Sequence, residues 1–385
     1  MNRPKTILIL LFLAAQTLKA QIYTFDHLGI DDGMSQNQVN AISKDEYGFM
    51  WFGTWDGLNR FDGYNFKVYK HRAFDTSSLS SNFITNLLND SKGRLWIGTN
   101  GGGLNLYQPE TETFLNLKFN PLNENSISNN SINAIYEDSN KRIWDATEFG
   151  LNLIKKSDDQ TYPLINQFFF QNPRLRSGSN YITDIVELRE DYFLISTDKG
   201  LIALNYEIEE SFSYKIINPF GSGKAGQLIT DLFIDSLNEI WAGTEEALYK
   251  AGQFDESYEF KFKALDSNLY GQNIFASGIK FINQDDEKQV WVGTLDGKLY
   301  ISDDSQDPVF QEVSKENSHS SHQDILVYNT FYQAPEEKIL WIGTDIDGVK
   351  KITLSGRNFE NIIYTGNTNS GLINPAVFSV YVDKM

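Results

Sequence analysis

Residues 39–61 read VNAISKDEYGFMWFGTWDGLNRF, and they are the best-formed copy of a pattern that recurs along the chain. A well-formed copy has a short apolar run, an Asp, and the motif W-x-G-T with its Trp six residues after the Asp. The Trp position falls at residues 51, 96, 144, 194, 241, 291 and 341, with Leu at 194. Seven units of about 48 residues match the length of a four-stranded propeller blade. The sequence therefore predicts an all-β fold, a seven-bladed β-propeller of four-stranded antiparallel blades that ends inside an eighth repeat.

The repeated residues are predicted to be structural, because every blade must pack on the next in the same way. The Asp is expected to cap free backbone N–H groups in a tight turn between the first two strands (a and b) of a blade, with Gly or Asn at the position of positive φ. The Trp can fill the space between neighbouring blades, the Gly permits close approach, and the Thr suits a strand. The structural positions are Trp51, Gly53, Trp96, Gly98, Trp144, Trp241, Gly243, Trp291, Gly293, Trp341 and Gly343.

Several copies depart from the pattern. The third has Asp145 and Ala146 where other copies have an apolar residue and Gly, and the fourth has Leu194 and Ser196 instead of Trp and Gly. The fifth has Glu-Glu-Ala at 245–247, and the sixth and seventh have poor a–b turn sequences. We expect these blades to pack less regularly than the others, and the fourth least regularly of all.

Composition limits the classes of function. The chain has 33 Lys and Arg against 51 Asp and Glu, a net charge of −18, which argues against nucleic acid as a partner. It has no Cys, which excludes disulfides, thiolate zinc sites and Cys nucleophiles. His319 and His322 lack a third ligand, so no metal site is predicted. Phosphate-binding, G-x-S-x-G and H-E-x-x-H motifs are absent from the sequence, and we predict neither a cofactor nor catalytic residues.

The two ends of the chain carry their own signals. Residues 1–20 have two early basic residues, an unbroken apolar run at 7–15 and a small residue at 20, which is typical of a secretory signal peptide. Residues 375–385 repeat the first strand and turn of a blade. We therefore expect a signal peptide at 1–20, a propeller at 21–365 and the truncated start of a second propeller at 366–385. Either residues 22–27 or residues 359–364 could supply the outer strand of blade seven.

Three stretches carry a family resemblance: LGIDDGMSQN at 28–37, GFMWFGT at 48–54 and DGLNRFDG at 56–63. They resemble the opening of two-component regulator propellers, the N-terminal periplasmic sensor region of hybrid two-component histidine kinases of the Bacteroidetes type. The resemblance covers nearly the whole chain after residue 20. It implies a periplasmic sensor domain that is not itself an enzyme. The parent receptor would be a sensor histidine kinase with a second propeller, anchored in the inner membrane.

A binding site is expected where the b–c turns of the blades meet the connections from each outer strand d to the next strand a. These connections differ in sequence and are long, at 70–82, 119–130, 171–180, 217–228 and 311–324. Trp55 is the one Trp outside the repeated position, and it could offer a stacking face for a sugar ring or simply pack on a neighbouring loop. The candidate ligand-binding residues are Trp55, Arg60, Arg72, Arg174 and Arg176.

Three functions remain open on the sequence. The first is a sensory propeller that detects a glycan-derived oligosaccharide or a similar small ligand and relays the signal to a cytoplasmic histidine kinase. The second is a structural or dimerisation propeller whose receptor binds the ligand elsewhere. The third is a propeller lyase or glycosidase, because paired carboxylates are plentiful in so acidic a chain. The expected partners are the ligand, the other domains of the same receptor and a second copy of the chain.

Overall fold

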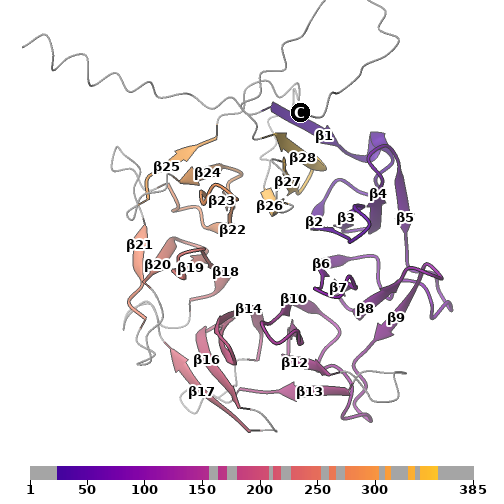
Figure 1. The fold of residues 1–385 in the computed structure, drawn as a ribbon, viewed down its shortest axis with the longest axis horizontal. Coiled ribbons are helices and arrows are strands. Elements are labelled where there is room, and N and C mark those ends of the chain that lie inside the picture. Colours follow the sequence, from indigo (N-terminus) through magenta and orange to yellow (C-terminus); the bar gives the residue numbers. More distant parts are fainter. Residues whose placement is uncertain are drawn as a thin grey trace, which may run out of the picture. The chain divides into compact units, whose positions relative to one another are not determined.

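A computed structural model of the protein describes residues 24–155, 164–170, 180–207, 211–217, 227–252, 260–265, 274–302, 308–313, 328–333 and 339–353. The unit Thr24–Ile352 consists of seven four-stranded antiparallel sheets arranged in a ring (Figure 1). The predicted seven-bladed propeller is therefore confirmed. The expected signal peptide and second propeller lie outside the described residues. In the part that is described, no helix is long and apolar enough to cross a bilayer.

Each blade lists its strands from the ring centre outward. The strands are β2 (Val39–Lys44), β3 (Met50–Thr54), β4 (Gly57–Phe61) and β5 (Phe66–Tyr69) in blade one; β6 (Ile84–Asn89), β7 (Leu95–Thr99), β8 (Gly103–Gln108) and β9 (Thr113–Leu117) in blade two; β10 (Ile132–Glu137), β11 (Ile143–Thr147), β12 (Gly150–Lys155) and β13 (Leu164–Phe168) in blade three; β14 (Ile182–Arg189), β15 (Tyr192–Thr197), β16 (Gly200–Glu207) and β17 (Ser211–Ile217) in blade four; β18 (Ile229–Ile234), β19 (Ile240–Thr244), β20 (Leu248–Ala251) and β21 (Lys263–Leu265) in blade five; β22 (Ile279–Gln284), β23 (Val290–Thr294), β24 (Leu299–Ser302) and β25 (Phe310–Glu312) in blade six; and β26 (Tyr328–Gln333), β27 (Ile339–Thr344), β28 (Val349–Thr353) and β1 (Thr24–Leu28) in blade seven. A single 3-10 turn, η1 (Ile30–Asp32), joins β1 to β2 among the described elements.

The ring closes through the N-terminal strand. The sheet of blade seven has the order β1-β28-β27-β26, so β1 supplies its outer strand. Of the two candidate segments, residues 22–27 therefore overlap the closing strand, and residues 359–364 lie outside the described residues. Joining strands from distant parts of the sequence in one sheet leaves blade seven with four strands like the others.

The Asp of the repeat binds the Trp as well as the turn. Asp45 illustrates the arrangement: its Oδ1 accepts the N–H groups of Tyr47 and Phe49 at 3.0 and 2.9 Å, and its Oδ2 accepts the indole N–H of Trp51 at 2.7 Å. We call this three-bond arrangement the Asp–Trp brace. The indole bond recurs at 2.8–2.9 Å in four more blades, in the pairs Asp90 with Trp96, Asp138 with Trp144, Asp235 with Trp241 and Asp285 with Trp291. Turn capping was predicted, whereas the indole bond was not.

The a–b turn of blade six is as regular as the others, which corrects the prediction of a poor turn there. Asp285 Oδ1 accepts the N–H of Gln289 at 2.9 Å, as in a complete brace. Lys288 takes the left-handed conformation (φ 67°) that Gly48 takes in blade one (φ 91°). The turn therefore needs a positive φ more than it needs Gly, and the brace supplies the energy that holds a Lys in it.

The braced Trp packs between blades, as predicted. Trp51 of blade one lies 5.0 Å from the Tyr107 ring of blade two, and Trp144 of blade three lies 4.9 Å from Phe193 of blade four. The Gly two residues after the Trp receives a side chain of the next blade: a Cβ on Gly53 would lie 2.5 Å from Ile84. The Thr that follows does more than favour a strand, because its hydroxyl donates to a carbonyl across the b–c turn. This bond is present in all seven blades, from Thr54, Thr99, Thr147, Thr197, Thr244, Thr294 and Thr344.

A belt of hydrogen bonds joins the inner strands around the ring. Every inner strand has a register irregularity after its first residue, which lets the second side chain point to the next blade. Asn40 Nδ2, for example, donates to the Ile84 carbonyl at 2.9 Å. The equivalent donors are Thr85, Asn133, Thr183, Thr230 and Asn329, the last of which donates to Val39 and so closes the belt across blades seven and one. Lys280 occupies this position in blade six.

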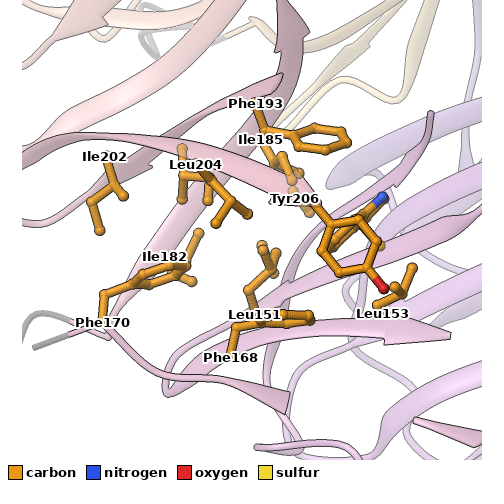
Figure 2. Close-up of a cluster of buried hydrophobic side chains, with 14 residues drawn as sticks. Leu151, Leu153, Phe168, Phe170, Ile182, Ile185, Phe193, Ile202, Leu204 and Tyr206 are labelled. Atoms are coloured by element: carbon orange, nitrogen blue, oxygen red, sulfur yellow. The ribbon is translucent and has the colours of Figure 1, made fainter. Parts of the chain in front are cut away.

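Blade four forms a complete sheet, so the expectation that it is the least regular blade is wrong. Its strands β14 and β16 have eight residues each, and they join through short hairpins. Apolar packing takes over from the missing brace. Figure 2 shows the cluster that joins blades three and four, in which Leu153 and Phe168 lie with Phe193 and Tyr206.

Three acids are buried in the sheets of blades three to five. Asp145 is fully buried in β11, where Asn152 donates to its Oδ2 at 2.9 Å and its Oδ1 has no partner among the described residues. Burial raises the pKa of Asp145 to about 7. Burial also raises the pKa of Asp184 to about 7 and, together with the charge of Asp184, that of Asp231. The third copy thus keeps its strands while holding an ionisable group in an apolar position.

The brace should contribute strongly to stability. We expect Asp235→Ala to lower the free energy of unfolding by roughly 2–4 kcal/mol, because the buried Trp241 Nε1 and two backbone N–H groups lose their acceptor. Urea denaturation monitored by Trp fluorescence measures this loss. Asp26→Ala, which removes an exposed acid from β1, is the matched control. Equal losses from the two variants would show that the brace is not a stabilising interaction.

Asp145 should make stability depend on pH. Its pKa is raised from 3.8 in the unfolded chain to about 7 in the fold, so the folded state holds the proton more tightly. Its contribution is therefore greatest below about pH 4 and is lost as the pH rises through 7. We expect the stability gained by Asp145→Asn, relative to the unsubstituted protein, to grow between pH 4 and pH 8 in urea denaturation. Comparison with the unsubstituted protein cancels the effects of Asp184 and Asp231, and a gain that does not change with pH would contradict the assignment.

Candidate functional site

The b–c turns and the d–a connections lie at one end of the blades, as predicted. The N–H groups of Gly57, Gly103 and Gly150 in three b–c turns each donate at 2.8 Å to a carbonyl just before the next blade's inner strand. We call this end the loop face, formed by the b–c turns and the residues that precede each strand a. Its backbone is fixed by these bonds, so side chains on it are carried by a rigid frame.

Two of the d–a connections are copies of one folded loop, which corrects the prediction that these connections are dissimilar. In the first, Ser78 Oγ accepts the N–H of Arg72 at 3.0 Å, and in the second, Ser126 Oγ accepts that of Asn120 at 3.0 Å. The residue after each Ser, Leu79 or Ile127, is fully buried in the blade core. These loops build the blades, and their length is no sign of ligand recognition. The repeated Ser-Leu-Ser and Ser-Ile-Ser at 78–80 and 126–128 could have revealed the match.

Trp55 lies on the loop face between blades one and two. Its indole stacks on Phe83 with centroids 5.1 Å apart and planes at 28°, and its backbone N–H donates to Gln38. The residue is nevertheless 51% exposed. Both possibilities raised for Trp55 are thus present together: it packs on a neighbouring loop residue and still exposes much of its ring. Phe83 supports the ring from the next blade, so the stacking platform is built by two blades.

The candidate Arg residues do not gather around Trp55. Arg60 lies in β4 with its guanidinium over the Phe49 ring, 4.6 Å from the centroid, at the end of the blade that carries the a–b turn. It faces away from Trp55 because it pairs with Trp51, at the opposite end of β3 from the b–c turn. Arg72 is on the first d–a loop, with Asp75 at 3.7 Å. Arg174 and Arg176 lie outside the described residues. The structure thus places Trp55 and Arg72 at the loop end and separates Arg60 from them.

Acidic side chains follow the loop face around the ring. The first residues of the seven b–c turns are Trp55, Asn100, Glu148, Asp198, Glu245, Leu295 and Asp345. Tyr181, partly exposed, holds the position in blade four that Phe83 holds in blade two. Burial, with the charges of Glu148 and Asp198, raises the pKa of Tyr181, so these two acids flank its hydroxyl. Sequence reasoning missed Phe83 and Tyr181, although both directly precede the first residue of an inner strand.

The basic groups at the loop end of the described chain already have acidic neighbours. Lys70 Nζ lies 2.6 Å from Asp56, and Lys350 forms a close ion pair with Asp347. Lys199 and Lys298 lie 3.7 Å from Asp198 and Asp296. Asn82 also donates to Asp56 at 3.0 Å. The described loop face therefore presents aromatic rings and carboxylates, and its cations are neutralised from within.

Metal-binding clusters of three or more His, Cys, Asp or Glu are not found among the described residues. His319 and His322 lie outside these residues. Candidate residues for a cofactor are likewise not assembled by the described part of the loop face. The chemistry that remains is noncovalent recognition through an aromatic platform and hydrogen-bond acceptors.

Three segments of the chain, residues 33–56, 78–101 and 126–147, match the two component regulator propeller family. Each segment runs from the end of a d–a connection through strands a and b into the b–c turn, in blades one to three. A curated relative, histidine kinase P4 of Formosa agariphila, is 42% identical over 77 residues, which cover 20% of this chain and 6% of the relative.

Solved structures of the same fold come from B. thetaiotaomicron. The extracellular domain of one hybrid two component system is 23% identical with a TM-score of 0.69, covering 87% of this chain and 42% of that one. A second such domain is 20% identical with a TM-score of 0.64, covering 86% of this chain and 42% of that one. The chain spans less than half the length of each of these proteins. It carries two component regulator propeller repeats in its first three blades, and its fold is that of the extracellular domains of hybrid two component systems.

Proposed function

We propose that this propeller is the periplasmic ligand-sensing domain of a two component receptor. It binds a glycan-derived oligosaccharide on the loop face and passes the signal to a histidine kinase outside this chain. The observation that carries the proposal is the half-exposed Trp55 on its Phe83 support, in a domain built from regulator propeller repeats. An aromatic face held by two blades is suited to stack on a sugar ring without reorganising.

The charges of the loop face favour an uncharged sugar. Carboxylates such as Glu148, Asp198 and Asp345 accept hydrogen bonds from hydroxyl groups, whereas they repel uronate or sulfate groups. The original grouping of Arg residues would have favoured such anions, but Arg60 lies at the far end of its blade. We therefore expect neutral oligosaccharides to bind better than acidic ones.

Signalling requires that the ligand prefer one of two arrangements of the receptor. Within this propeller the blades are tied by the belt and the braces, so the ligand has little to rearrange inside the ring. The change is therefore expected between the propeller and the rest of the receptor. This places the coupling at surfaces of the ring and not in its core.

Thermal shift against neutral and acidic oligosaccharides tests the proposal. A ligand at 100 times its Kd stabilises the folded state by about 2.7 kcal/mol. The measurement is made on residues 21–385 and on the receptor extended through its next domains. Stabilisation of both proteins by the same neutral sugar supports recognition in this propeller. Stabilisation of the longer protein alone favours the alternative, in which this propeller is structural and the ligand binds elsewhere.

Trp55 should contribute directly to affinity. For a sugar that binds residues 21–385, we expect Trp55→Ala to raise the Kd roughly tenfold, or about 1.4 kcal/mol, because the stacking face is lost. Calorimetric titration measures the change. Tyr64→Ala is the matched control, because Tyr64 is 90% exposed in the turn between β4 and β5, at the opposite end of blade one. Unchanged affinity in Trp55→Ala would remove Trp55 from the site.

A further inference from the structure

The outer strand of blade four differs from the other outer strands. β17 lies at the edge of its sheet in the order β14-β15-β16-β17 (Figure 1). It has seven residues, whereas the described outer strands of the other blades have three to five. A long edge strand exposes a row of backbone N–H and C=O groups that the ladder of its own blade does not use.

β17 lacks the features by which edge strands usually avoid pairing. Its register with β16 runs without a bulge from Glu207↔Ser211 to Leu201↔Ile217. The sequence SFSYKII contains no Pro and no acid, and Lys215 is its one charged residue. Phe212 and Ile216 are 38% and 36% exposed. Such a straight, apolar edge is a template for strand addition.

We propose that β17 pairs antiparallel with β17 of a second copy of this chain, about a two-fold axis that passes beside Tyr214. A two-fold pairing closes on itself, so the interaction gives a dimer and does not propagate into a fibre. The two sheets of blade four then join into one eight-stranded sheet. The strand register determines which side chains meet.

The register centred on Tyr214 uses all seven residues and opposes compatible groups. It places Phe212 opposite the partner's Ile216, an aromatic and β-branched pair of the kind that stabilises antiparallel sheets. Ser213 stands opposite the partner's Lys215. A shift by one residue on each strand, which centres the pairing on Lys215, would oppose two lysines and shorten the pairing to five residues. The Tyr214 register is therefore the favoured one.

Charge also favours this edge over other surfaces. The chain has 51 acidic and 33 basic residues, so most of its surface repels a second copy. β17 carries a positive charge and no acid, which spares the paired strands that repulsion. A single pair of edge strands buries a small area, so we expect a weak dimer with a Kd of roughly 1–100 μM.

Sedimentation equilibrium on residues 21–385 tests the proposal through one position. Ser213→Lys places a lysine opposite the partner's Lys215 at two symmetric points, and we expect the dimer Kd to rise roughly tenfold. Ser213→Glu places an acid opposite the same lysine, and we expect the Kd to fall. Ser213 and Lys215 are both exposed, so circular dichroism should show unchanged folding in both variants.

Val68→Lys is the control for added charge, because Val68 is exposed on β5, the outer strand of blade one. It should leave the Kd unchanged. The opposite responses of Ser213→Lys and Ser213→Glu would establish the antiparallel β17 pairing. A chain that stays monomeric at 200 μM, or a dimer whose Kd responds equally to Ser213→Lys and Val68→Lys, would overturn it. Neither outcome depends on a sugar, so the proposal stands or falls separately from ligand binding.

Discussion

A single carboxylate fixes both the turn and the core of a blade. The Oδ1 of Asp45 holds two turn N–H groups while its Oδ2 holds the indole of Trp51, and four further blades repeat the indole bond. The brace orients the Trp, and the oriented Trp meets aromatic rings of the next blade. An interaction that is local in sequence thereby sets the spacing of the whole ring, which is why the period of the pattern could be read so directly as blades.

The remaining inter-blade contacts build on that spacing. The Gly of W-x-G-T admits an Ile or Val from the next inner strand, and Asn or Thr side chains join the inner strands in a belt. The Thr hydroxyl fixes each b–c turn, so residues such as Trp55 are presented from a fixed backbone. The loop face is thus an outcome of blade packing, and its chemistry depends on which side chains those turns happen to carry.

The sequence predicted what depends on periodicity and local chemistry. The blade number, the capping Asp and the packing of Trp followed from spacing alone. Arg60 was misplaced because position in sequence does not tell which end of a strand a side chain reaches. The d–a loops were misread because the buried Leu79 and Ile127 cannot be told from surface residues without the Ser hydrogen bonds around them. Phe83 was missed because its contact with Trp55 crosses blades.

Exchange of the indole N–H protons in a ¹⁵N-Trp labelled sample, assigned by single Trp→Phe variants, tests the brace most directly. The account predicts slow, similar exchange for Trp51, Trp96, Trp144, Trp241 and Trp291, and fast exchange for Trp55, which stands outside any brace. Fast exchange at one of the five, in a blade whose backbone amides remain protected, would contradict it.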